Sequence, residues 1–141
     1  RGNFANRYVT LPLIKTRLLH WINYKYDSPG YLHWGFNAWG ANGDPFGDVS
    51  APANDWPGGD SHIVYPGYRK LYPSIRLAAM RDGIRDYDLL KMVEARDSIR
   101  AQAFVNAIIP ADSPGNIGFF GRHALIGIFK QSISDSVQQI K

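Results

Sequence analysis

The sequence contains no cysteine, which excludes disulfide bonds and thiolate metal sites. It has no apolar run close to the roughly 18 residues that a membrane-spanning helix needs. The longest such run, Ala124 to Phe129, is interrupted by Gly127. The net charge is +4, yet no run of basic residues is longer than Arg69-Lys70. Dispersed charge indicates a solvated surface, whereas a nucleic-acid interface needs clustering on one face. We therefore predict neither a nucleic-acid nor a membrane partner.

Glutamate is almost absent, because eleven of the twelve acidic residues are aspartates and Glu94 is the single glutamate. What the sequence does have is apolar material: 45% of its 141 residues are hydrophobic and 13% are aromatic. That is enough for the core of one ordinary domain. Arg1 is not a natural first residue, so we expect a cut or processed N-terminus.

Alternating residues give the stretch Tyr31–Trp39 two faces of different character, which predicts a β-strand. The apolar face holds Leu32, Trp34, Phe36 and Ala38, and the other holds His33, Gly35, Asn37 and Trp39. Two such faces fit a barrel strand, with one face packed on outer helices and the other facing the lumen. Trp39 would then stack on a sugar ring at the strand's end while Asn37 binds hydroxyls. Alternatively, Trp39 is a core residue and Asn37 opens a turn.

Apolar residues at three- and four-residue steps predict four helices. These cover residues 10–26, 74–96, 99–108 and 117 onward, with Thr10 and Ser74 as N-caps of the first two. Gly83 lies inside the second helix, where glycine costs about 1 kcal/mol relative to alanine, so close packing is expected there. The charge run Arg81–Asp88 consists either of exposed pairs or includes a buried Arg–Asp pair.

A second strand is predicted at Asp60–Tyr65, ended by Pro66-Gly67, and we expect it to run parallel to the first. The connection Gly40–Gly59 is long and carries aromatic and acidic residues, so it is either an ordered loop over a site or a disordered loop. Two parallel strands do not make a stable domain. The fold class is therefore α/β, and we interpret the chain as the C-terminal segment of a (β/α)8 TIM-type barrel followed by C-terminal helices.

Six stretches resemble, in order and spacing, the C-terminal part of the glycoside hydrolase family 123 catalytic domain, also catalogued as a domain of unknown function. They are Asn6–Tyr8, Thr16–Trp21, Tyr31–Asn37, Gly43–Phe46, Gly59–Gly67 and Ser74–Tyr87. Beyond about residue 96 the likeness fades to generic helix. We therefore assign residues 1–96 to a glycoside hydrolase barrel and residues 97–141 to a helical extension of the same domain.

The resemblance implies a barrel that cleaves β-linked N-acetylgalactosamine with retention, assisted by the substrate. In that scheme the substrate's acetamido oxygen attacks the anomeric carbon, an aspartate orients the acetamido group, and a neighbouring glutamate is the general acid/base. This sequence contains no Asp-Glu dipeptide, and Glu94 lies near the end of a predicted helix. We therefore assign no catalytic residue and expect the pair upstream of Arg1, in the remaining N-terminal part of the barrel.

Polar and aromatic residues at the ends of the predicted strands are the candidates for binding a carbohydrate substrate. They are Arg7, Asn37, Trp39, Asp44, Asp48 and Tyr65. No cofactor is predicted. Asp44 and Asp48 would alternatively bind a cation through oxygen ligands. The histidines His20, His33 and His62 lack a zinc-binding spacing and are interpreted as structural.

Two other function classes remain open. The first is a non-catalytic carbohydrate-binding module that uses Trp39, Trp56 and Tyr65 for stacking. The second is a structural piece of a helical scaffold, which would require Tyr31–Trp39 to be helical. The sequence does not specify a compartment, although a glycan-degrading parent protein is compatible with secretion or a periplasmic location.

Overall fold

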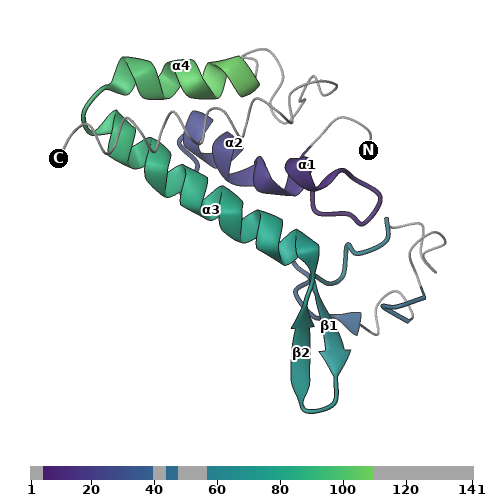
Figure 1. Ribbon diagram of the computed structural model, residues 1–141. Coiled ribbons are helices and arrows are strands. Elements are labelled where there is room, and N and C mark those ends of the chain that lie inside the picture. The colour runs from purple at the N-terminus through teal and green to yellow at the C-terminus, as the bar shows by residue number, and fades with distance from the viewer. Residues whose placement is uncertain (1–4, 40–43, 48–56, 110–141) are drawn as a thin grey trace.

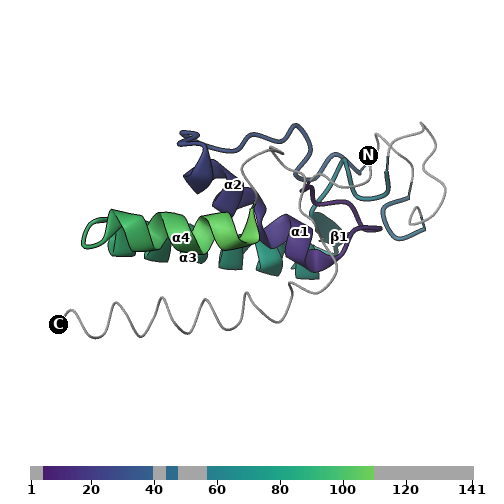
Figure 2. The same ribbon diagram turned by 90° about the horizontal axis from the view of Figure 1, so that it is seen from above.

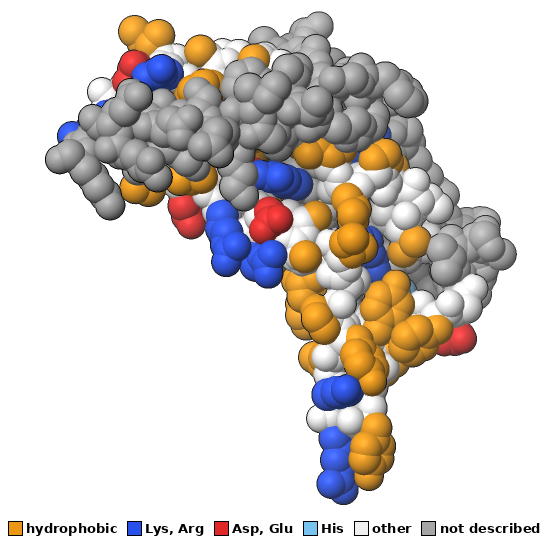
Figure 3. All heavy atoms as spheres, viewed as in Figure 1, with side chains coloured by type: hydrophobic (Ala, Val, Ile, Leu, Met, Phe, Trp, Pro, Cys, Tyr) orange, Lys and Arg blue, Asp and Glu red, His pale blue; other side chains and the backbone are white. Residues whose placement is uncertain are grey.

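The computed structural model describes residues 5–39, 44–47 and 57–109, and it has a mixed α/β architecture (Figure 1). Its elements in chain order are α1 (Leu13–Arg17), α2 (Leu19–Lys25), β1 (Val64–Gly67), β2 (Lys70–Pro73), α3 (Ile75–Glu94) and α4 (Ser98–Ile108). The long helix α3 contacts α1, α2 and α4. The β1–β2 hairpin projects away from the helices at the N-terminal end of α3 (Figure 1). Seen from above, α4 overlies α3, and the two helices contact each other (Figure 2). In the space-filling view, the hairpin is a narrow projection that carries hydrophobic and basic side chains (Figure 3).

The helix predictions are largely confirmed. The first predicted helix is present as α1 and α2, which meet at Leu18, but it begins at Leu13 after Pro12 and not after Thr10. Ser74 caps α3 as predicted, since its Oγ accepts the Leu77 N–H at 3.2 Å. Local signals were sufficient here because capping and apolar periodicity act within a few residues.

The hydrophobic core lies between α2, α3 and α4. Its buried members are Leu18, Trp21, Tyr24, Leu90, Val93, Ala101, Phe104, Val105, Ile108 and Ile109. The close packing predicted at Gly83 is confirmed, because a Cβ atom there would clash with the carbonyl oxygen of Arg17 in α1. A side chain at position 83 would therefore push α1 away from α3.

Both interpretations of the charge run on α3 apply, at different positions. Asp86 is 1% exposed and accepts from Arg17 Nε at 2.6 Å and Arg17 Nη2 at 2.8 Å. Trp21 Nε1 donates to the same carboxylate at 3.0 Å. Asp82, by contrast, forms exposed pairs with Arg81 and Arg85. The buried pair connects α3 to α1, and the hydrogen bond that Arg17 donates to Asp86 raises the pKa of Arg17.

The strand predicted at Tyr31–Trp39 is wrong. The segment is irregular, and its apolar face is open: Leu32 is 90% and Trp34 57% exposed. Its only β-type contact among the described residues is an isolated antiparallel bridge between Asn37 and His62. The physical reason is that Gly35 lies against the Ser61 backbone, where a Cβ atom would be 2.5 Å from the carbonyl oxygen. This close approach fixes the segment without a strand ladder.

The second predicted strand is also corrected. It begins at Val64, not Asp60, and continues through Pro66 and Gly67 to pair antiparallel with β2. Parallel pairing is therefore wrong for the part of the chain that the structure describes. A two-stranded ribbon has only edges, so Pro66 and Pro73, which lack an N–H donor, fit within it. Arg69 takes a positive φ of 53° in the connecting turn.

Several predicted features lie outside the described residues. These are the last helix, from residue 117 onward, and most of the loop 40–59, including Asp48 and Trp56. No helix within residues 5–39, 44–47 and 57–109 is long and apolar enough to cross a membrane.

Candidate functional site

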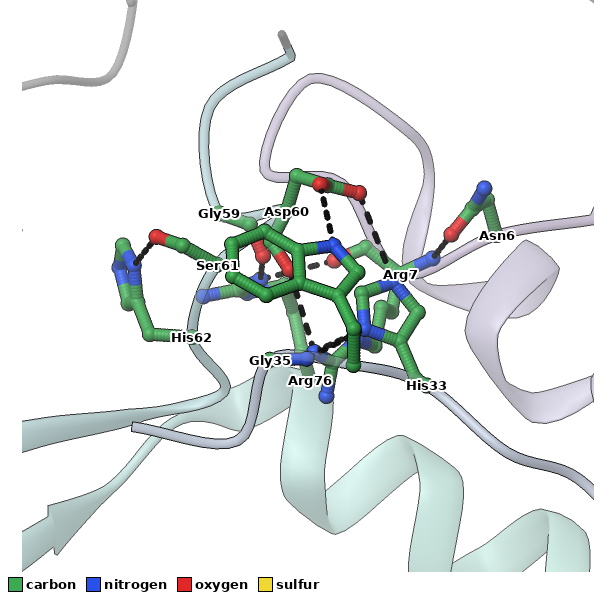
Figure 4. Close-up of polar contacts among 10 residues, drawn as sticks. Asn6, Arg7, His33, Gly35, Gly59, Asp60, Ser61, His62 and Arg76 are labelled. Carbon is green, nitrogen blue, oxygen red and sulfur yellow. Dashed lines mark hydrogen bonds and ion pairs between the residues drawn. The ribbon is translucent and has the colours of Figure 1, made fainter. Parts of the chain in front are cut away.

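Three loop segments and the first turn of α3 bring together five polar or amphipathic side chains, here called the Asp60 cluster (Figure 4). Its members are Arg7, His33, Trp34, Asp60 and Arg76. The residues come from positions far apart in the sequence, so the cluster is a product of the tertiary fold.

The carboxylate of Asp60 lies at the centre of the cluster and is 2% exposed. Its Oδ2 accepts from Trp34 Nε1 at 2.8 Å, and its Oδ1 lies 3.4 Å from His33 Nε2. The indole of Trp34 stacks on the imidazole of His33, with ring centroids 6.4 Å apart and planes 21° apart. Trp34 is thus held in one orientation while more than half of its surface remains exposed.

The hydrogen bonds of His33 define its tautomer. Nδ1 accepts from Arg7 Nη2 at 2.6 Å and from the Gly35 N–H at 3.2 Å, so the ring proton lies on Nε2, facing Asp60. Burial, followed by the charge of Arg7, lowers the pKa of His33, and Asp60 only partly offsets this effect. The imidazole is therefore neutral. Its Nδ1 accepts a hydrogen bond from Arg7, and its Nε2–H faces the carboxylate of Asp60.

The two arginines of the cluster are buried and are tied mainly to backbone. Arg7 Nη2 also donates to the Asp60 carbonyl oxygen at 3.2 Å. Arg76 Nη1 donates to the carbonyl oxygens of Arg7 at 2.8 Å and Gly59 at 2.9 Å. Gly59 has a φ of 79°, and a Cβ atom there would clash with the Arg76 guanidinium. Burial lowers the pKa of both arginines.

A second group of residues, beside the cluster, contains most of the predicted substrate-binding positions. Trp39 Nε1 donates to the Val64 carbonyl oxygen at 2.8 Å. The ring of Tyr65 lies 5.2 Å from Phe46 and 5.1 Å from His62, centroid to centroid. Since His62 also forms the bridge with Asn37, these residues lie together on one side of the hairpin base.

The structure places the six predicted site residues unequally. Asn37, Trp39 and Tyr65 lie together, and Asp44 belongs to the turn that carries Phe46, where its Oδ1 accepts the Phe46 N–H at 3.0 Å. Arg7 is buried, with its Nη2 bound to His33 and Asp60. Asp48 lies outside the described residues.

Sequence reasoning missed Asp60, Trp34 and Arg76 as cluster members and treated His33 only as structural. The alternation pattern itself hid them, because consecutive residues of a strand point to opposite faces. His33 and Trp34 are consecutive, yet both contact Asp60. The adjacency of a histidine, a tryptophan and a nearby glycine was the only local signal for a non-strand conformation.

The cluster is rich in hydrogen-bond donors and contains a single carboxylate. Within the part of the chain that the structure describes, no three His, Asp or Glu side chains are grouped so as to hold a metal ion. The buried donors of the cluster that have no partner among the described residues are Arg7 Nε and Arg76 Nη2, and the surface that it presents to solvent is the exposed ring of Trp34. The cluster does not present a pair of carboxylates in these residues.

Comparison with known proteins places this site in a family. The family model of the glycoside hydrolase 123 catalytic domain matches residues 1–93, which include every residue of the Asp60 cluster and all six predicted site residues. No curated protein matches the chain. The matched stretch also includes α1, α2, the hairpin and nearly all of α3. The chain therefore belongs to the glycoside hydrolase 123 catalytic domain family.

Proposed function

We propose that this chain is the C-terminal part of a (β/α)8 barrel that hydrolyses β-linked N-acetylgalactosamine with retention and assistance from the substrate. In this proposal the chain supplies substrate-binding residues, while the Asp–Glu pair comes from the remaining N-terminal part of the barrel. The observation that carries the proposal is the family match over residues 1–93. The family provides the glycoside hydrolase class, and the barrel and the sugar are what the resemblance implies.

The position of the single glutamate supports the proposal that the catalytic pair comes from another part of the barrel. Glu94 is the last residue of α3 and forms an ion pair with Lys91 on the same helix. The Asp60 cluster, in contrast, contacts the opposite end of α3 through Arg76. A general acid must reach the glycosidic oxygen, so a glutamate at the far end of a 20-residue helix does not serve a site at the near end.

The grouping of Asn37, Trp39 and Tyr65 supports a binding role. An aromatic face stacks on the apolar face of a pyranose, and amides bond to its hydroxyls. Asn37 is exposed, and the rings of Trp39 and Tyr65 are half-buried and fixed by their contacts. Arg7, Asp44 and Asp48 complete the proposed set of binding residues.

Hydrolysis of an aryl N-acetyl-β-galactosaminide tests the proposal directly. We expect residues 1–141 alone to release no aryl alcohol, and the longer protein that contains them to release it. Turnover by the 141-residue chain would contradict the proposed location of the catalytic pair. Failure of the longer protein on this substrate, with activity on another β-glycoside, would contradict the sugar but not the family.

The binding residues are tested in the longer protein. We expect Trp39→Ala to raise KM by about fivefold, since stacking on an aromatic ring contributes on the order of 1 kcal/mol beyond buried area. Leu32→Ala is the matched control, because Leu32 lies on the same segment and is almost fully exposed. Sugar binding by residues 1–141 without catalysis in the longer protein would instead favour the carbohydrate-binding module.

A further inference from the structure

A pocket of about 310 Å³ lies at the N-terminal end of α3, on the side of the chain segment that precedes α1. Its walls are mostly apolar and include Leu11, Leu13 and Ile75. Three polar side chains, those of Tyr65, Ser74 and Arg76, also line it. A volume of this size is in the range of small-ligand sites, which combine apolar walls with a few polar groups.

Arg76 brings an unbalanced charge to this pocket. The residue is 4% exposed, and its Nη2 is buried without a hydrogen-bond partner among the described residues. Nη1, by contrast, is bound to two carbonyl oxygens. No described carboxylate forms an ion pair with Arg76, and the side chain that partly offsets the effect of burial on its pKa is the phenol of Tyr65. Buried charges are normally paired, so this guanidinium lacks an anion.

The end of α3 adds to the same positive potential. The 20-residue helix has no acidic residue in its first turn. The Ser74 hydroxyl, which caps the helix, is neutral and also lines the pocket. A helix N-terminus carries about half a positive charge and favours anions. The N-terminus of α3 and the guanidinium of Arg76 thus both contribute positive potential to the pocket.

We propose that this pocket binds a small organic acid, with its carboxylate at Arg76 and the N-terminus of α3 and its apolar body against Leu11, Leu13 and Ile75. A carboxylate suits the site because a guanidinium forms charge-assisted hydrogen bonds with it, roughly twice as strong as neutral ones. A neutral sugar would leave the charge of Arg76 unpaired. The pocket is therefore distinct in chemistry from the proposed sugar contacts at Asn37 and Trp39, with Tyr65 shared between the two.

Benzoate and benzamide test the role of charge, because they share a shape and differ in ionisation. Binding to the longer protein, or to residues 1–141 if they fold, is followed by calorimetry and by shifts of the Ile75 and Leu77 amide signals. We expect benzoate to bind about tenfold more tightly than benzamide, the difference between a charged and a neutral hydrogen bond. Equal affinities would mean that the pocket recognises only the ring, and the proposal would be wrong.

Ile75 offers a matched pair of variants that leave Arg76 intact. It is exposed and starts the helix, where glutamate is well tolerated. Ile75→Glu places a competing carboxylate at the pocket and is expected to weaken benzoate binding by about tenfold. Ile75→Gln has nearly the same shape as the glutamate variant but carries no charge. It removes the apolar contact that Ile75 offers to the ring, so we expect it to weaken benzoate binding by about threefold, clearly less than Ile75→Glu does.

Two further outcomes decide the proposal. Unchanged benzoate affinity in Ile75→Glu would place the anion elsewhere on the protein and overturn the assignment. If neither probe binds the longer protein, a carboxylate side chain from outside the described residues already satisfies Arg76, and the pocket is not a site for a free acid. Neither result depends on hydrolytic activity, so the proposed function is tested separately.

Discussion

The part of the chain that the structure describes contains two buried aspartates, Asp60 and Asp86, which have similar hydrogen-bond donors but opposite surroundings. Asp86, in the helical half, accepts from Arg17 and from the indole of Trp21. Asp60, in the loop half, accepts from the indole of Trp34 and lies beside His33. Trp21 is fully buried, whereas Trp34 is mostly exposed. The indole that binds Asp86 is therefore part of the buried core, whereas the indole that binds Asp60 lies at the surface.

Charge balance separates the two regions further. One guanidinium, that of Arg17, faces Asp86, so this pair is neutral. Near Asp60 there are two buried guanidiniums, those of Arg7 and Arg76, and His33 is neutral. An ion pair that only stabilises the fold needs equal numbers of positive and negative charges. Donors in excess of the available carboxylates, next to exposed aromatic rings, are able to bind a ligand. The comparison therefore indicates a stabilising role for the helical half and supports the proposed ligand binding in the loop half.

Removing the carboxylate of Asp86 is the strongest way to break the helical half. We expect Asp86→Ala to lower the free energy of unfolding by about 3–5 kcal/mol, because it leaves the Arg17 charge and the Trp21 N–H without an acceptor. Urea unfolding measures this loss. Asp88→Ala, an exposed aspartate on the same helix, is the control and should change stability by less than about 0.5 kcal/mol. A similar loss in both variants would show that the buried pair is not responsible.

Gly83→Ala tests the contact between α1 and α3 that this pair accompanies. Helix propensity alone would stabilise the variant by about 1 kcal/mol. The clash with the Arg17 carbonyl oxygen should outweigh this gain, so we expect a net destabilisation of about 1–3 kcal/mol. The sign of the change in urea midpoint is decisive, because only close packing makes it negative.

In the loop half the corresponding change is smaller. Trp34→Phe keeps an aromatic ring but removes the N–H that Asp60 accepts, and we expect a loss of about 1 kcal/mol. Leu32→Ala, an exposed neighbour, should be neutral in the same urea titration. A loss above that of Gly83→Ala would mean that Asp60 contributes as much to stability as Asp86 does.

The sequence predicted the helical half better than the loop half for a physical reason. Ser74 is recognisable as a cap because its hydroxyl bonds to a backbone N–H only three residues away. Gly83 indicates close packing because a glycine within a helix has no side chain to keep a neighbour away. The contacts of Asp60 join residues 26 positions apart or more. Such pairings leave no periodic trace, so alternation over Tyr31–Trp39 was interpreted as a strand. Asn37, Trp39 and Tyr65 were predicted as substrate-binding residues from their places at strand ends, and the strand that was to carry Asn37 and Trp39 is absent.

The pH dependence of stability sharpens the comparison, because the helical pair does not involve a histidine. Burial and Arg7 lower the pKa of His33 in the folded protein, whereas the unfolded chain has a value of about 6.5. The unfolded state then binds more protons at acidic pH, so stability rises with pH in this range. The contribution of His33 is fully present above about pH 6.5 and is lost as the pH falls through the folded value.

His33→Gln isolates this contribution. We expect the urea midpoint of the original protein to fall between pH 7.5 and about pH 5, and the fall to be shallower in the variant, which has no imidazole to protonate at this position. A residual slope should persist, because burial also lowers the pKa of His20. Equal slopes in both proteins would mean that His33 accepts a proton without cost. The donor–acceptor chain from Arg7 through Nδ1 and Nε2 to Asp60 would then not be fixed, since protonated Nδ1 cannot accept from Arg7.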